Sequence, residues 1–274
     1  MKRLDDHLAL GLKALKSGEI TLLKVLSPGP ARVCKSNMLN NAHYDKITLV
    51  EQRVLLLGIA QLNPFEPVPD EIEITAEGYA NTYHVTVDRA YQSFAETADR
   101  LPGRTLRVFD GQEGGRVISW LKPNTTAAEL CPKGDGAFYL CFSDEVKVYL
   151  AGLSRCFTEY ELEKIAPLSS CYSIRLYELF CQWRSTGKLV VSLEDFRGRL
   201  GLDGKHEQFK YLKRDVINLA IEELCEKSGL AIAWEVKRRS NKAVGLVFNF
   251  KEKSLGNSKL VRFPSNPKQA HPSI

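Results

Sequence analysis

Basic side chains gather at two places in the last third of the chain, and their types and spacing suit the binding of a polyanion. The stretch Lys210–Arg214 reads KYLKR, and Lys237, Arg238, Arg239 and Lys242 follow in a second group. Lysine and arginine neutralise phosphates, and the planar guanidinium of arginine can also bind guanine through two parallel hydrogen bonds. The two groups therefore predict contacts with the phosphates and bases of a nucleic acid.

The distribution of charge along the chain supports this interpretation. Residues 185–274 hold 17 lysines and arginines against 10 acidic residues, whereas residues 1–184 hold 21 against 23. The net charge of +5 therefore comes from the C-terminal third. Such a distribution suits a polyanion that is held mainly by one end of the molecule.

Two segments with the same order of elements position these residues. Ile74–Tyr83 and Val191–Leu200 each contain a strand residue, then a Thr or Ser that can cap a helix, and then an aromatic residue at the same offset. Each leads through a turn into a long helix, predicted at about 86–101 and 207–227, and each long helix is followed by two strands. This order is that of a winged helix, whose second helix enters the major groove while its hairpin follows a phosphate strand.

The predicted fold is therefore α+β, with two tandem winged-helix domains that are mainly helical and carry small antiparallel β-ribbons. We assign residues 33–156 to the first domain and residues 157–251 to the second. Residues 1–32 form an N-terminal extension, read as a short amphipathic helix and a strand-like stretch. Residues 252–274 hold three prolines and are expected to form a mobile tail. The clearest single helix, 48–62, begins at a Thr cap with a Glu three residues later.

The first long helix presents three candidate contact residues. An apolar stripe that includes Val87 and Tyr91 faces the core, which turns Arg89, Gln92 and Ser93 outward. These three lie near the N-terminal end of the helix, the end that meets base edges in a winged helix.

The second long helix and its hairpin supply the larger basic set. Tyr211 and Arg214 lie opposite the apolar stripe, with Lys210 on its flank. Ideal α-helical geometry places Lys213 toward the apolar side, from which its long side chain is expected to reach a phosphate. The complete set of predicted DNA contacts is Lys210, Tyr211, Lys213, Arg214, Lys237, Arg238, Arg239, Lys242, Arg89, Gln92 and Ser93.

Composition argues against several other classes of protein. No apolar run reaches 18 residues, and Asp5, Asp6 and His7 stand where an export signal would begin its apolar stretch, so we expect a cytoplasmic protein without a membrane span. The seven cysteines form no CxxC pair and lie in no finger-like spacing with histidines. We therefore expect reduced thiols, no metal and no cofactor.

The sequence contains no motif that indicates phosphoryl transfer or DNA nicking. The chain has no GxxxxGK[ST] loop for phosphoryl transfer, and its GQEGG sequence lies between two predicted strands as a hairpin turn. A rolling-circle nickase would need paired histidines for its metal, and no His-x-His pair is present. The chain is predicted not to be an enzyme.

The order and spacing of these elements resemble a known family, the iteron-binding plasmid replication initiators of the theta type. The resemblance runs over about residues 40–251. The segments that carry it are LVEQRVLLLGIAQL, AYQSFAETADRL with the hairpin after it, SIRLYELFCQW, and FKYLKRDVINLAIEEL. No single one of them is specific, but together their order and spacing are.

The resemblance implies two winged-helix domains that straddle repeated double-stranded DNA sites, the iterons, at a replication origin. It matches Lys210, Lys213 and Arg214 to the family's DNA-contact helix. It further implies a homodimer in equilibrium with a monomer: monomers open the origin, dimers repress the chain's own gene, and host replication proteins are partners. The chain departs from the family in its extension 1–32 and in the modest basicity of its first domain.

A transcriptional regulator without a role in replication is the main alternative, because it would have a similar surface. Direct repeats of about two helical turns beside the gene would favour the initiator, whereas inverted half-sites would favour the regulator. The concentration of positive charge in the second domain leads us to expect that this domain anchors the DNA. The first domain would then divide its surface between DNA and a partner subunit.

Overall fold

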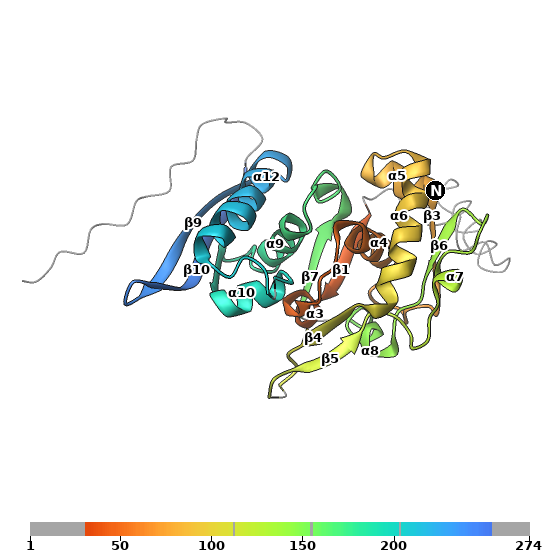
Figure 1. Ribbon diagram of the computed structural model, residues 1–274, viewed down its shortest axis with the longest axis horizontal. Coiled ribbons are helices and arrows are strands. Elements are labelled where there is room, and N and C mark those ends of the chain that lie inside the picture. The colour runs from red at the N-terminus through yellow and green to blue at the C-terminus, as the bar shows by residue number, and fades with distance from the viewer. Residues whose placement is uncertain (1–30, 112, 154–155, 203, 254–274) are drawn as a thin grey trace, which may run out of the picture. The chain divides into compact units, whose positions relative to one another are not determined.

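The computed structural model describes residues 31–111, 113–153, 156–202 and 204–253. The helix and strand predicted within residues 1–32, and nearly all of the predicted tail, lie outside these residues. Every described element from Arg32 onward belongs to one unit by its internal contacts. Figure 1 shows two groups of elements along this unit, each with a helix pair and a hairpin.

The first helix-turn-helix forms where the sequence repeat begins. Strand β3 (Ile72–Thr75) leads into α5 (Ala76–Tyr83), whose first turn is capped by the Thr75 hydroxyl, which accepts a hydrogen bond from the Gly78 N–H. His84 takes a left-handed conformation and turns the chain into α6 (Val87–Arg100), which Thr86 caps in the same way. Local caps of this kind satisfy N–H groups that the helix leaves free, so they fix where each helix starts.

The remaining elements of the first half surround this pair. The predicted capping box at Thr48 is confirmed, since its hydroxyl accepts from Glu51 and the Glu51 carboxylate accepts from the Thr48 N–H. Two small antiparallel sheets have the orders β2-β4-β5 and β3-β6. The elements are β1 (Arg32–Ser36), α3 (Asn37–Asn41), β2 (His43–Tyr44), α4 (Leu49–Ile59), β4 (Thr105–Val108), β5 (Arg116–Ser119), α7 (Ala127–Leu130), β6 (Ala137–Leu140) and α8 (Asp144–Lys147).

The second half repeats the plan with a longer hairpin. Its sheet has the order β8-β10-β9 and is antiparallel throughout. The long helix predicted at 207–227 is present but is not uniform, because a π-helical segment separates its two α-helical parts. The elements are α9 (Cys171–Gln182), β8 (Lys188–Ser192), α10 (Leu193–Arg199), α11 (Phe209–Tyr211), the π-helical segment (Leu212–Asn218), α12 (Leu219–Lys227), β9 (Leu230–Arg239) and β10 (Lys242–Glu252).

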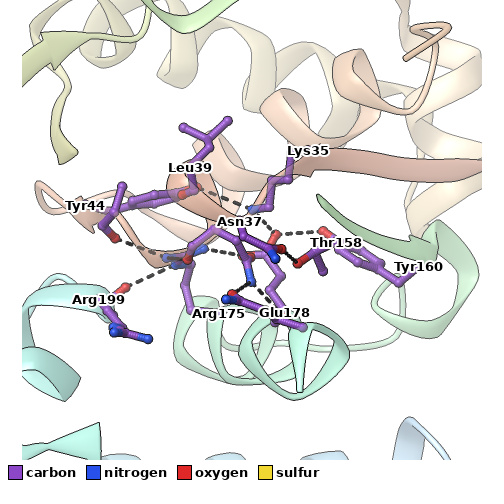
Figure 2. A network of polar contacts seen from close by, with 12 residues as sticks. Lys35, Asn37, Leu39, Tyr44, Thr158, Tyr160, Arg175, Glu178 and Arg199 are labelled. Atoms are coloured by element: carbon purple, nitrogen blue, oxygen red, sulfur yellow. Dashed lines mark hydrogen bonds and ion pairs between the residues drawn. The ribbon is translucent and has the colours of Figure 1, made fainter. Parts of the chain in front are cut away.

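A strand pair and a buried ion network hold α9 in place. Strand β7 (Phe157–Glu161) pairs antiparallel with β1, and the side chains around this pair meet α9 (Figure 2). The carboxylate of Glu178 on α9 is fully buried and accepts hydrogen bonds from Lys35 Nζ at 2.6 Å and Tyr160 Oη at 2.6 Å. Arg175 pairs with the other carboxylate oxygen and donates to the Asn40 carbonyl at 2.9 Å. These groups hold α9 against β1, β7 and α3.

The charge state of Glu178 follows from its partners. Burial alone would raise the pKa of this carboxyl, but the positive charges of Lys35 and Arg175 outweigh that effect and hold the pKa below its usual value. Glu178 is therefore ionised in the folded protein.

Aromatic packing forms the core of the second domain. Phe196 on α10 is fully buried and stacks on Phe248 of β10 with ring centroids 5.9 Å apart, while Phe180 of α9 meets the same Phe248 at 5.5 Å. One residue from each of three elements thus meets at one point. The helix-turn-helix of this domain is fixed to its sheet by this contact.

Replacing Phe196 by alanine should therefore lower the free energy of unfolding by about 3–5 kcal/mol, the usual cost of truncating a buried phenylalanine. Guanidinium-induced unfolding followed by circular dichroism measures this change. Phe65, whose surface is 76% exposed, is the matched control, and Phe65→Ala should leave stability nearly unchanged. An equal effect of the two substitutions would contradict the packing described here.

Replacing Glu178 by glutamine should cost about 3–5 kcal/mol at neutral pH, because Lys35 and Arg175 would keep buried charges without a counter-ion. The folded pKa of Glu178 lies below its ordinary value of 4.5, so its contribution is complete above that pH and is lost as the pH falls through the folded pKa. The stability difference between wild type and Glu178→Gln should therefore shrink in acid. Unfolding curves from pH 7 to pH 3 measure it, and a difference independent of pH would contradict the ionised state.

Candidate nucleic-acid interface

The long helix of the second domain carries the first group of predicted contacts. Lys210, Tyr211, Lys213 and Arg214 are all exposed, while Leu212 between them is buried. The structure therefore brings these four predicted residues together on one solvent-facing surface.

Lys213 is exposed, and its Nζ lies 5.8 Å from the centre of the ring of Trp234 on β9, a residue that packs against the core. This position agrees with the expected course of the side chain along the apolar side, and its contact with a phosphate stays a prediction. Lys213 lies at the start of a π-helical segment, Leu212–Asn218.

Tyr211 forms a platform for the neighbouring cations. The Lys210 ammonium lies 4.6 Å from the centre of the Tyr211 ring, and the Arg214 guanidinium lies 5.2 Å from it. A cation near an aromatic face is attracted to it and loses some of its freedom. Arg214 also pairs with Asp215, a residue that the sequence analysis did not select.

The hairpin of the second domain carries the other basic group. Lys237, Arg238 and Arg239 end β9, Lys242 begins β10, and all four side chains are exposed. The two turn residues, Ser240 and Asn241, have φ of 46° and 65°, the left-handed pair that a tight two-residue hairpin requires. The four charges therefore stand at the end of a rigid ribbon.

A bulge and a glycine hold this ribbon to the domain. The register of β9 and β10 shifts between Ala243 and Gly245. A Cβ at Gly245 would lie 2.8 Å from the carbonyl oxygen of Val191 on β8, so only glycine fits there without displacing the strand. The bulge marks the place where the hairpin leaves the three-stranded sheet.

In the first domain, one of the predicted contacts is wrong. Ser93 is only 2% exposed, and its hydroxyl donates to the Arg89 carbonyl one turn earlier. A small side chain satisfied by its own helix can face the core. Val87 and Tyr91, predicted in the apolar stripe, are partly exposed instead, so the buried face of α6 is rotated from the predicted one.

The other two predicted contacts of the first domain are exposed and engaged with each other. Arg89 donates to the Gln92 amide oxygen at 3.0 Å and lies 3.5 Å from Glu96. The sequence analysis also missed two cations on the first hairpin. Arg116 pairs with Asp110 and Glu145, and Arg107 donates to the Gly114 carbonyl. Arg89 and Arg116 are thus each paired with acids of their own domain.

The described residues include no group of three histidine, cysteine or acidic side chains that could hold a metal ion. Burial, with a contribution from Glu159, raises the pKa of the Cys34 thiol to about 11, and burial raises that of Cys181 to about 11 as well. Such thiols are protonated at neutral pH and are poor nucleophiles. Among the described helices, none is long and apolar enough to cross a membrane.

Two helix-turn-helix units, each followed by an antiparallel hairpin, define a tandem winged-helix protein. The chain belongs to the family of initiator replication proteins. The family model described as initiator replication protein, WH1, matches residues 32–181, and the model described as initiator Rep protein, WH2, matches residues 192–250. Both the predicted fold class and the predicted family are confirmed.

Individual relatives agree with this assignment. The chain is 26% identical over 226 residues to a replication initiation protein of Escherichia coli, which covers 79% of this chain and 68% of that protein. It is 24% identical over 220 residues to an uncharacterized 27.6 kDa protein of Escherichia coli, covering 75% of this chain and 89% of that protein.

A solved structure shares the fold. The Pi initiator protein, crystallised in complex with iteron DNA, superposes with a TM-score of 0.66 at 21% identity, over 83% of this chain and 100% of that chain. The likeness covers both winged-helix domains, so the tandem arrangement is common to the two proteins.

Proposed function

We propose that this chain starts the replication of a plasmid by binding directly repeated double-stranded DNA sites, the iterons, at the plasmid's origin. One observation carries the proposal: the second winged-helix domain presents exposed cations on its long helix and at the tip of its hairpin. These are the two places at which a winged helix meets DNA. The iteron DNA bound by the structurally similar Pi initiator supports the same kind of ligand.

The residues divide by role in this proposal. Arg214 contacts a base in the major groove, while Lys210 and Lys213 contact phosphates on either side of it. The four cations of the hairpin tip, from Lys237 to Lys242, follow the adjacent phosphate strand. The phosphate contacts supply affinity without sequence preference, and the base contact supplies the sequence preference.

The first domain has a smaller share of the DNA contact in this proposal. Arg89 and Gln92 on α6 remain candidates, although each is engaged with the other. The hairpin β4–β5 also leaves Phe109 and Val117 partly exposed, at 44% and 51%. Exposed apolar residues on a hairpin suit a protein partner. We assign this surface to a second copy of the chain, in a dimer that is in equilibrium with the monomer and represses the chain's own gene.

The protein acts here by binding and not as an enzyme. It works in the cytoplasm, where it opens the origin and recruits host replication proteins. These parts of the proposal rest on the family alone.

An origin assay tests the proposal. A plasmid that carries the DNA flanking the gene, but no other initiator, should replicate when the full chain is supplied from a second plasmid. The variant Arg214→Ala should lose this activity, whereas Phe65→Ala should keep it. If the wild-type chain binds the flanking DNA in a gel shift but never supports replication, the regulator is favoured over the initiator.

The hairpin makes a separate prediction about salt. Replacing Arg238 and Arg239 by alanine should weaken binding to specific and unrelated duplexes alike, because phosphate contacts carry no sequence information. The slope of log affinity against log salt concentration should fall by about 2, or one for each phosphate contact removed. Fluorescence anisotropy from low to moderate salt measures the slope. An unchanged slope would exclude the hairpin tip from the interface.

A further inference from the structure

The side chain of Arg214 is 70% exposed and contacts two neighbours on its own helix. Its Nε donates to Asp215 Oδ1, and one of its terminal nitrogens donates to Asp215 Oδ2 at 2.9 Å. Its guanidinium also lies 5.2 Å from the Tyr211 ring centre. The carboxylate and the ring thus hold a group that would otherwise sample many rotamers.

The side-on form of this ion pair leaves the far edge of the guanidinium free. Arginine has five N–H donors in a fixed planar arrangement. The pair with Asp215 uses the Nε–H and one N–H of a single terminal nitrogen. Parallel N–H groups on the two terminal nitrogens therefore remain available along the outer edge.

Asp215 also lies beside the turn before the helix. Its Oδ2 lies 3.6 Å from Nδ1 of His206, and its hydrogen bond with Arg214 lowers the pKa of its carboxyl. The turn that carries His206 is braced by Arg197 of α10, which donates to three successive carbonyls, those of Lys205, His206 and Glu207, at 2.9, 2.7 and 2.9 Å. The first helix of the helix-turn-helix thereby fixes the acid on the second.

The available edge matches one base in particular. Guanine presents two acceptors, N7 and O6, in the major groove, and two parallel N–H groups of arginine bind both. An arginine that is already oriented loses less conformational freedom on binding, so more of the contact energy appears as discrimination. A phosphate contact would gain less from this arrangement, because an arginine can approach a phosphate from many directions.

We propose that Asp215 is a positioning residue that sets Arg214 to read a guanine in the major groove, and so determines sequence specificity. The inference rests on the proposed DNA-binding function. An acidic residue on the DNA-facing helix would by its charge repel DNA, but here it would improve the choice of sequence.

The test uses modified DNA and the full chain. The wild-type protein first selects its preferred duplex from a random library, and each guanine is then replaced in turn by 7-deazaguanine, which lacks the N7 acceptor. At one position the substitution should weaken wild-type binding by about 5-fold or more, the range for losing part of a bidentate base contact. Arg214→Ala should show no such penalty at that position.

The variants Asp215→Ala and Asp215→Asn test whether Asp215 positions Arg214. Both should reduce the 7-deazaguanine penalty to less than about 2-fold, since an unheld arginine discriminates poorly, while their affinity for an unrelated duplex stays equal or rises after the loss of a negative charge. Glu226→Ala, an exposed acid three turns further along the helix, is the control and should keep the full penalty. Circular dichroism checks that each variant is folded.

The remaining outcomes overturn the inference in distinguishable ways. A full penalty in both Asp215 variants would mean that this residue does not position Arg214. A full penalty in Arg214→Ala would mean that Arg214 reads no guanine, although the proposed function would stand. If the wild-type chain selects no sequence from the library, the proposed function itself fails.

Discussion

The position of α9, the helix that precedes the second helix-turn-helix, depends on one buried carboxylate. Glu178 lies where β1, β7 and α9 meet, and it balances the charges of Lys35 and Arg175. Removing charged groups from water is costly, so each one is stable only where its ion-pair and hydrogen-bond partners are in place. Apolar surfaces can slide past one another with little loss, but the short bonds of Glu178 to Lys35 and Tyr160 are made only with α9 in this position. The network therefore fixes α9 against β1 and β7.

A second polar contact extends this constraint to the DNA-facing part of the molecule. His43 on β2 lies 3.1 Å from Asp195 on α10, and its imidazole packs so closely on Gly198 that a Cβ there would lie 2.1 Å from the ring. The first domain thus contacts α10, and Arg197 on the same helix braces the turn that leads into the DNA-facing helix. A continuous set of contacts runs from the junction to Asp215 and Arg214.

The features that could be predicted from the sequence depend on neighbouring residues. The features that could not be predicted depend on contacts between residues far apart in the chain. The caps at Thr48, Thr75 and Thr86 act within three residues, so the starts of α4, α5 and α6 could be read directly. The exposed cations were also found, because a cluster of basic residues can be recognised in the linear sequence. By contrast, Lys35 and Glu178 are 143 residues apart, and no spacing rule links them.

The wrong predictions have a related origin. The burial of Ser93 depends on what packs against α6, and hydrophobic periodicity did not reveal the π turn in the second long helix. Arg107 and Arg116 were missed because they meet their partners only in the folded hairpin. A residue's type suggested its chemistry, but its orientation came from the whole domain.

The π-helical segment Leu212–Asn218 has a consequence for comparing this chain with its relatives. A π turn holds more residues than an α turn, so side chains beyond it are rotated about the axis relative to a continuous α-helix. In a relative whose helix is α-helical throughout, equal numbering would match residues that face different directions after this turn. Structural equivalence beyond this segment, along α12, therefore requires an alignment gap inside the helix, at a place where sequence comparison alone would not insert one.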